Sequence, residues 1–429
     1  MKIAFHTLGC KVNQYETEAM KEQFARDGHQ IVGESDFADV YIINTCTVTG
    51  LADRKSRQYI RRMKKKNPRS VVAVTGCYVQ VNPDEVSSLP EVDILAGVNE
   101  KHRIIDYVDD FRRQRGEHLQ QEHILERGDL SAYEEMGTIT SMESRTRAYI
   151  KIEEGCDRFC SYCVIPYARG PVRSRSEDAI LREAASLVKA GFKELILTGI
   201  NTALYADLPS LLAKLDEMEG VFRVRLSSLE PTVIDADSVK ELFGFKRLCH
   251  HLHLSMQSGS DRVLAAMGRP YDREDFFRIV DELRKFDPLY GITTDMIVGF
   301  PGETEEDFLD TLDAVDRVRF GKVHAFRYSD RPGTAASAMA EKIDPALKKE
   351  RAERLAQKGE AAAAAFFAEN EGATAQVLFE QPDEEDGTIS GYAGNYIRVY
   401  TDLDRELENE FADVVITHPY RDGVYGKRM

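Results

Sequence analysis

The chain has 429 residues, of which 42% are hydrophobic and 30% charged, and its formal net charge is −16. This length predicts two or three globular domains with cores of their own. The acidic balance excludes nucleic-acid binding by the surface as a whole, because phosphate is held mainly by Lys and Arg. No apolar run reaches the roughly 20 residues of a membrane span, and the first residues turn polar too early for a signal peptide, so we expect a cytoplasmic protein without a membrane partner.

The N-terminal part alternates between short apolar runs and helical patterns. We expect strands at Lys2–Leu8, Val40–Asn44 and Ser70–Thr75, and helices at Tyr15–Asp27 and Leu51–Lys66. Buried β-branched runs separated by helices are typical of a parallel sheet covered by helices. We therefore predict an N-terminal parallel α/β sheet domain over residues 1–135, followed by a charged connection.

Repeated β/α units fill residues 142–364. Strands are expected at Ala148–Glu153, Glu194–Thr198, Phe222–Ser227, His251–Ser255, Thr293–Val298 and Lys322–Tyr328. Six such repeats are fewer than the eight of a closed barrel, so the pattern predicts a partial (β/α)6 barrel. A long helix from Asp344-Pro345 to about Phe367 ends the region, because Asp is a favoured N-cap and Pro suits the first turn.

Residues 366–429 change to a period of two, which predicts a small all-β barrel. Its expected strands are Ala373–Phe379, Thr388–Tyr392, Tyr396–Tyr400 and Ala412–Thr417. From Phe366 onward the chain has 14 acidic residues against 5 Lys or Arg, which argues against phosphate binding by the whole module. The aromatic rings of Tyr392, Tyr396 and Tyr400 are suited either to stacking on bases or to core packing.

Three cysteines follow the first expected strand of the barrel. Cys156, Cys160 and Cys163 have the spacing C-x3-C-x2-C, and thiolates suit iron-sulfur clusters and zinc. Structural zinc needs a fourth ligand, and the nearest downstream histidine is His250. Three ligands on a four-iron cluster leave one iron open to a small molecule. The pattern therefore favours a 4Fe-4S cluster, with zinc or chance as the alternatives.

Three more cysteines follow the expected N-terminal strands. Cys10, Cys46 and Cys77 stand at the carboxyl ends of successive strands, which meet at one edge of a parallel sheet. They predict a second cluster with three protein ligands, and the alternative is three buried thiols. Cys249 is left without a companion and is expected to pack as a small hydrophobe.

Short motifs surround both sets of cysteines. They are Thr7-Leu8-Gly9-Cys10, Asn44-Thr45-Cys46, Thr75-Gly76-Cys77, Ile165-Pro166-Tyr167-Ala168-Arg169-Gly170, Leu197-Thr198-Gly199, Ser227-Ser228-Leu229-Glu230-Pro231, Gln257-Ser258-Gly259-Ser260 and Ile297-Val298-Gly299-Phe300-Pro301-Gly302-Glu303-Thr304. Together with the small C-terminal barrel, they resemble the radical S-adenosylmethionine methylthiotransferase family over essentially the whole chain.

This resemblance implies two 4Fe-4S clusters and S-adenosylmethionine as cofactors. The cluster on the barrel would cleave S-adenosylmethionine to a 5′-deoxyadenosyl radical, which removes hydrogen from an unactivated carbon. The second cluster would deliver sulfur, and a further S-adenosylmethionine would supply the methyl group. The C-terminal barrel would be a TRAM-like RNA-binding module. An electron donor such as flavodoxin or ferredoxin is implied, and the sulfur donor stays open.

The resemblance also suggests which residues hold S-adenosylmethionine. Residues near the ends of barrel strands are favoured for ligand binding. The candidates are Tyr162, Thr198, Gly199, Glu230, Ser255, Gln257, Asp295 and Arg175. Arg169, Arg173 and Arg175 are each suited to pairing with the carboxylate of S-adenosylmethionine or with RNA phosphate. No general acid or base is predicted.

The residues after the first cysteine bear on the substrate. Cys10-Lys11-Val12-Asn13-Gln14-Tyr15-Glu16-Thr17 is similar to the branch that acts on threonylcarbamoyladenosine. That resemblance implies methylthiolation of C2 of N6-threonylcarbamoyladenosine at position 37 of tRNA. Isopentenyladenosine in tRNA and an aspartate on a ribosomal protein, which would suit the acidic module, are the alternatives.

A basic segment makes an RNA substrate plausible. From Arg54 to Arg69 there are nine Lys or Arg and no acid, which indicates either a phosphate-binding helix or a solvated basic face. A non-catalytic iron-sulfur electron carrier is the alternative from another class of protein. Two incomplete ligand sets argue against it, because carriers usually close each cluster with four cysteines.

Overall fold

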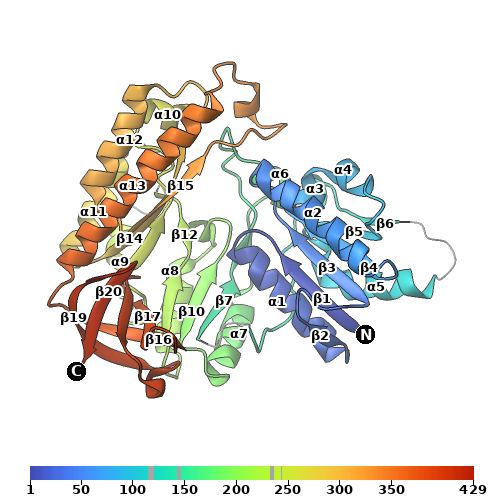
Figure 1. Ribbon diagram of the computed structural model, residues 1–429, viewed down its shortest axis with the longest axis horizontal. Coiled ribbons are helices and arrows are strands. Elements are labelled where there is room, and N and C mark those ends of the chain that lie inside the picture. Colours follow the sequence, from blue (N-terminus) through green and yellow to red (C-terminus); the bar gives the residue numbers. More distant parts are fainter. Residues whose placement is uncertain (115–119, 143–145, 232–235, 243) are drawn as a thin grey trace.

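The computed structural model describes the chain except for residues 115–119, 143–145, 232–235 and 243. Figure 1 shows three bodies in chain order: a sheet domain in blue, a larger β/α body from green to orange, and a small red barrel at the C-terminus. This arrangement confirms the predicted fold class. Among the described residues, no helix is long and apolar enough to cross a bilayer.

The N-terminal sheet has six parallel strands in the order β2-β1-β3-β4-β5-β6. Their bounds are β1 Lys2–Thr7, β2 Gln30–Val32, β3 Val40–Thr45, β4 Val71–Gly76, β5 Ile94–Ala96 and β6 Gln121–His123. Every residue of β3 and β4 is buried, as expected for strands covered on both faces. The sequence did not predict β2, β5 and β6, because three residues are too few to show a periodic pattern.

Helices cover both faces of this sheet. One face packs against α1 (Lys11–Arg26) and α5 (Ile104–Arg113), and the other against α2 (Gly50–Lys66), α3 (Cys77–Val81) and α4 (Pro83–Ser87). Helix α1 begins at Lys11 and not near Tyr15 as predicted, so Cys10 lies at its N-cap. The side chain of Thr49 caps α2 by accepting a hydrogen bond from the Ala52 N–H.

The central body is a partial barrel of parallel strands in two groups, β11-β10-β7 and β12-β13-β14-β15. The strands are β7 Arg147–Lys151, β10 Glu194–Thr198, β11 Arg223–Leu226, β12 Ser228–Leu229, β13 His251–Leu254, β14 Gly291–Val298 and β15 Lys322–Arg327. An isolated bridge between Val224 and Leu248 connects the groups. Among the described residues β7 and β15 do not pair, so the barrel is open on that side.

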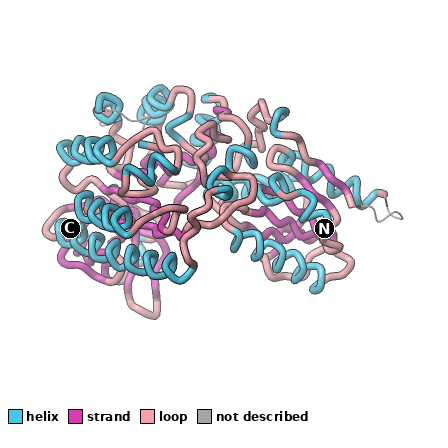
Figure 2. The backbone as a smooth tube through the Cα atoms, turned by 90° about the horizontal axis from the view of Figure 1, so that it is seen from above, coloured by secondary structure: helices cyan, strands magenta, loops and turns pink. Residues whose placement is uncertain are grey.

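Helices form the outer layer of the partial barrel, as Figure 2 shows from above. They are α7 Glu177–Lys189, α8 Leu208–Glu217, α9 Ala236–Leu242, α10 Asp261–Ala266, α11 Arg273–Phe286, α12 Glu305–Val318 and α13 Pro345–Glu369. The short helix α6 (Ile165–Arg169) lies instead beside α3 of the N-terminal domain (Figure 1). Asp344 caps α13 through the Ala346 N–H, as predicted from the Asp-Pro pair. A short pair of strands, β8 (Glu153–Glu154) and β9 (Arg173–Ser174), lies beside the cysteine loop of the barrel.

The C-terminal module is a closed five-stranded barrel in the order β16-β17-β18-β20-β19. Its strands are β16 Thr374–Asp383, β17 Thr388–Ala393, β18 Arg398–Asp402, β19 Phe411–Tyr420 and β20 Gly423–Arg428. The last strand was not predicted, because its only buried aliphatic side chain is Val424.

The module closes the amino-terminal end of the partial barrel. The guanidinium of Arg225 donates to the Gly394 carbonyl at 3.0 Å, and that of Arg223 donates to the Tyr392 carbonyl at 2.8 Å. The His251 ring stacks on Tyr396 with the centroids 4.6 Å apart. The turn between β17 and β18 therefore fits into the base of the barrel.

This docking decides two of the sequence alternatives. The rings of Tyr392 and Tyr396 lie 4.7 Å from the guanidinium carbons of Arg147 and Arg225 respectively, so both rings pack inside the protein and are not exposed platforms for bases. Some acidic residues of the module form ion pairs with the barrel. Glu380 pairs with Arg147 at 2.7 Å, and Glu410 pairs with Lys193, so two of its acids hold it on the barrel.

Substitution at Gly291 tests this docking. A Cβ at Gly291 would overlap the Asn395 carbonyl, whereas a Cβ at Gly394 in the same turn would meet nothing within 4 Å. We expect Gly291→Ala to lower the free energy of unfolding by about 1–3 kcal/mol through overpacking, measured as a lower denaturant midpoint. The matched variant Gly394→Ala should behave like the wild type. Equal stability of both variants would contradict the docking.

Candidate functional site

Cys10, Cys46 and Cys77 come together at one edge of the N-terminal sheet. They follow β1, β3 and β4, which are neighbours in the sheet. A Cβ at Gly9 would lie 2.9 Å from Cys46 Cβ and 3.3 Å from its Sγ, and Gly9 has a φ of +118°. Glycine is therefore required there, both for the backbone conformation and for the close approach of the two loops.

The three thiols share one electrostatic environment. Burial, together with the neighbouring thiols of Cys77 and Cys10, raises the pKa of the Cys46 thiol to about 12. Burial also raises the pKa of Cys77, against the opposing effect of Arg169 and Lys101. Such thiols lose their protons when a metal ion binds to the sulfur. Three converging sulfur donors fit a cluster held by three cysteines.

The second set of cysteines lies in the loop between β8 and α6. The Cys156 N–H donates to the Gly170 carbonyl at 3.0 Å, and the Cys163 N–H donates to the Cys160 carbonyl at 2.9 Å. Burial raises the pKa of Cys156 to about 11 and that of Cys163 to about 12, and thiols of the same loop add to both shifts. This loop also fits a cluster with three protein ligands.

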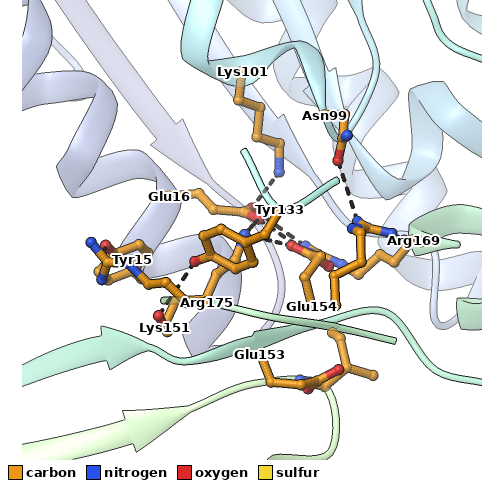
Figure 3. Close-up of polar contacts among 12 residues, drawn as sticks. Tyr15, Glu16, Asn99, Lys101, Tyr133, Lys151, Glu153, Glu154, Arg169 and Arg175 are labelled. Carbon is orange, nitrogen blue, oxygen red and sulfur yellow. Dashed lines mark hydrogen bonds and ion pairs between the residues drawn. The ribbon is translucent and has the colours of Figure 1, made fainter. Parts of the chain in front are cut away.

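Arg169 links the two sets of cysteines. It is fully buried at the end of α6, which starts two residues after Cys163 and packs beside α3. Its Nε donates to Cys77 Sγ at 3.2 Å, and its Nη1 donates to Glu16 at 2.9 Å and to Glu154 at 2.8 Å (Figure 3). One guanidinium therefore joins the barrel loop to the N-terminal cysteine site.

Two lysines complete this buried ion group. Lys101 pairs with Glu16, and Lys151 pairs with Glu16 at 3.0 Å and with Glu154 at 2.5 Å (Figure 3). Although burial alone would raise it, the pKa of Glu16 is held well below its usual range by Arg169, Lys101 and Lys151. Three cations against two carboxylates leave one positive charge, which suits thiolates at the adjacent cysteines.

A cavity of about 190 Å³ lies between the two sets of cysteines. Val48 and Thr49, which follow Cys46, form one side of it, and Tyr162 and Cys163 form another. Its remaining wall comes from the barrel and includes Gln257, Asp295, Ile297, Phe326 and Tyr328. The cavity therefore lies at the carboxyl ends of the barrel strands, the usual place for a ligand in this type of fold.

Tyr162, Gln257 and Asp295 are the candidates for S-adenosylmethionine binding that line this cavity. The backbone of Gln257 has a φ of +68°, which only a few non-glycine residues of the described chain adopt. Its N–H donates to the Asp295 carbonyl at 2.9 Å. This hydrogen bond connects the loop after β13 to β14 at the mouth of the barrel.

Thr198, Gly199, Glu230 and Ser255 stand at the ends of β10, β12 and β13. The side chain of Glu230 accepts hydrogen bonds from Arg158 at 2.7 Å and from Asn201 at 2.9 Å. The structure thus brings these four residues to the same rim of the barrel as the cysteine loop.

Arg175 is not brought to this rim. Its guanidinium is buried and pairs with Glu183 and with Glu135, the latter at 2.9 Å. Arg173 is also buried and donates to the backbone carbonyl of Leu130 at 2.9 Å. The three arginines considered for phosphate or carboxylate binding, Arg169 included, therefore have internal partners.

Several site residues escaped the sequence analysis. Glu153 accepts hydrogen bonds from the N–H groups of Ile200 at 2.8 Å and Asn201 at 2.9 Å, and burial raises its pKa to about 8. Arg269 donates to the Tyr162 hydroxyl at 2.7 Å. A buried acid just before a cysteine motif was a usable signal for Glu153. No pattern in the sequence pointed to Arg269.

Comparison with known proteins agrees with this geometry. Residues 2–97 match a family described as "Uncharacterized protein family UPF0004", and residues 150–315 match the "Radical SAM superfamily". Over 436 residues the chain is 39% identical to the threonylcarbamoyladenosine tRNA methylthiotransferase MtaB of Bacillus subtilis, covering 99% of this chain and 96% of that protein. The chain belongs to the radical S-adenosylmethionine methylthiotransferase family. Membership makes it an enzyme and implies a 4Fe-4S cluster with S-adenosylmethionine.

Relatives come from two branches of this family. The chain is 40% identical over 402 residues to MtaB of Thermotoga maritima, covering 92% of this chain and 90% of that protein. It is 33% identical over 428 residues to a tRNA-2-methylthio-N(6)-dimethylallyladenosine synthase of Clostridium perfringens, covering 96% and 94%. The solved structure of TsrM from Kitasatospora setae has a TM-score of 0.61 at 14% identity over 78% of this chain and 75% of that one, which shows a shared fold.

Removal of the Arg169 guanidinium should disrupt the buried ion group. Arg169→Met leaves Glu16 and Glu154 with fewer buried partners, so we expect a loss of about 3–5 kcal/mol in unfolding free energy, measured with denaturant. Iron bound after reconstitution should fall too, because Cys77 loses its donor. Arg182→Met, at an exposed position of α7, is the control. Wild-type stability and iron content in Arg169→Met would refute the role of this group.

Proposed function

We propose that this enzyme methylthiolates C2 of N6-threonylcarbamoyladenosine at position 37 of tRNA. The observation that carries the proposal is the cavity between the cysteine loop of the barrel and the residues after Cys46, because a base held there contacts Cys163 and the loop that leads from the N-terminal cysteine site. Identities of 39% and 40% to enzymes named for threonylcarbamoyladenosine support this substrate. We also propose domain limits of 1–135, 142–364 and 366–429 for the three bodies.

In the proposed reaction, a cluster on Cys156, Cys160 and Cys163 supplies radical chemistry with S-adenosylmethionine, and a cluster on Cys10, Cys46 and Cys77 supplies sulfur. The chain's own residues bind and orient the reactants. The residues suited to hold S-adenosylmethionine at the barrel rim are Thr198, Gly199, Glu230, Ser255, Gln257 and Asp295, and Tyr162 lines the cavity from the cysteine loop. A reductant such as flavodoxin or ferredoxin completes the proposal.

Helix α2 supports an RNA substrate. It starts four residues after Cys46, and most of its basic side chains are exposed. The exposed ones in and just after the helix are Arg54, Lys55, Arg61, Arg62, Lys65, Lys66 and Arg69. Arg57 and Lys64 differ, because they pair with Glu85 and Asp93. The exposed basic row runs from Arg54, near the cysteine site, along α2 to its far end, so it is suited to bind successive phosphates of an RNA that reaches the site.

The acidic C-terminal module does not favour a ribosomal protein as the substrate. Half of its 14 acids form ion pairs within the protein, and Glu384, Asp386 and Asp404 pair with arginines of the same module. Glu380 and Glu410 hold the module on the barrel. Paired carboxylates add little attraction for a basic partner.

The proposal is tested by nucleoside mass spectrometry of tRNA from cells that lack the gene. We expect 2-methylthio-N6-threonylcarbamoyladenosine to disappear and its unmethylthiolated precursor to accumulate. Wild-type enzyme and Cys249→Ala should restore the product, whereas Cys46→Ala should not and should bind about half of the iron. An unchanged nucleoside profile in the deletion strain would refute the proposed substrate.

Charge reversal on α2 tests the RNA surface. We expect Lys65→Glu with Lys66→Glu to weaken tRNA binding about tenfold or more and to flatten the dependence of log Kd on log salt, because fewer counterions are released. Arg182→Glu with Lys189→Glu, at exposed positions of α7, is the matched control. If both double variants weaken binding equally, α2 has no special role.

A further inference from the structure

A group of three polar side chains lies at the barrel side of the cavity, and the two histidines in it have no role in the proposed radical chemistry. The three residues are His253, Asp295 and His324, which lie on β13, β14 and β15. One imidazole nitrogen of each histidine and one carboxylate oxygen of Asp295 all lie within 4.8 Å of one another. Asp295 and His324 are direct neighbours in the strand register. Because Asp295 also lines the cavity, the group borders the space in which the substrate is proposed to bind.

Hydrogen bonds orient one of these histidines. His253 Nδ1 lies 2.9 Å from Thr293 Oγ1, and its Nε2 lies 3.3 Å from Asp295 Oδ2. Among the described residues, His324 has no hydrogen-bond partner, and its ring lies beside that of His253 with the centroids 5.9 Å apart. A half-buried imidazole in this position has a free nitrogen for a ligand.

Lys11 brings a positive charge to the same place from the N-terminal domain. It directly follows Cys10 and is half-buried at the start of α1, which packs against β7, a strand at the open edge of the barrel. Within the described chain its ammonium has neither a hydrogen bond nor an ion pair, although Asp295, Glu194, Arg225 and Arg147 all act on it electrostatically. Arg225 and Arg147 are already held by Glu194 and Glu380, so Lys11 is the cation left for a ligand.

We propose that Lys11 and His324 bind the carboxylate and neighbouring polar atoms of the N6 substituent of the substrate base. This inference rests on the proposed function, in which that substituent is threonylcarbamoyl. The substituent carries a carboxylate, a hydroxyl and a urea group, which match an ammonium and an imidazole N–H donor. An isopentenyl group has no partner for them and would leave a half-buried ammonium unpaired, which disfavours its binding.

Two imidazoles and one carboxylate are also a set that binds metals. Lys11 disfavours a bound metal ion, because its ammonium interacts electrostatically with Asp295, the only carboxylate of the set. His253 Nε2 also already faces Asp295. The site therefore suits an anionic ligand better than a divalent cation.

The test uses reconstituted full-length enzyme and two anticodon stem-loop RNAs. One carries N6-threonylcarbamoyladenosine, and the other carries the same nucleoside with its carboxylate converted to a carboxamide. For the wild type we expect kcat/KM to be about 10- to 100-fold higher on the carboxylate RNA, as for loss of a hydrogen-bonded charge. Lys11→Met and His324→Leu should lower kcat/KM on that RNA and shrink the preference to near unity. Lys11→Arg should recover part of the preference, and Lys189→Met on α7 should keep all of it.

The outcomes separate the two proposals. If the wild type methylthiolates neither RNA, the proposed function fails. If it acts on the carboxylate RNA but His324→Leu keeps the wild-type preference, this inference fails and the proposed function stands. Iron content and the visible spectrum are recorded for every variant, because Lys11 adjoins Cys10. His324 lies on a barrel strand away from the cysteines. If Lys11→Met loses iron, the substrate preference of His324→Leu therefore tests the inference. One equivalent of a divalent metal besides iron, absent from His324→Leu, would also overturn the inference.

Discussion

A buried arginine holds the two halves of the active centre together. Arg169 donates to Cys77 Sγ, Glu16 and Glu154 at 3.2, 2.9 and 2.8 Å, and Lys101 and Lys151 complete the group. Breaking up buried charges of this kind is costly, since each ion left behind lacks both water and a partner. The N-terminal sheet and the barrel loop are therefore fixed relative to each other. The distance between the two cysteine sites follows from the same contacts.

Because the barrel is open on one side, the fixed position of the N-terminal domain affects the interior of the barrel. Because β7 and β15 do not pair among the described residues, the N-terminal domain can bring Lys11 and the residues after Cys46 to the barrel interior. The opposite end of the barrel is closed by the C-terminal module, through Arg223, Arg225 and the stacking of His251 on Tyr396. The cavity therefore lies at the end of the barrel opposite the C-terminal module, next to the start of the basic helix α2.

Local patterns were enough for much of the architecture. Continuous apolar runs predicted the central strands of the first sheet, because these strands are buried on both faces. Several barrel strands, such as Phe222–Ser227 and His251–Ser255, were predicted from alternating apolar residues. The position of a cysteine just after each strand then predicted its place at the sheet edge. The same logic failed for β20, where Gly423–Arg428 is paired on both sides but has little apolar content. It also failed for the start of α1, whose first turn is largely polar.

The sequence by itself determined the three-part fold, the two sets of cysteines and the family, because strand periodicity and ligand spacing are local properties of the chain. Only the tertiary structure decided which charged and aromatic residues serve the site. Arg175 and Arg169 look alike in the sequence, yet one pairs with Glu183 and the other donates to Cys77. Lys11, His253 and His324 lie on separate elements, and Tyr396 packs on Arg225 instead of facing solvent. The physical reason is that charge pairing and cavity lining depend on contacts between residues far apart in the chain, which no local pattern records.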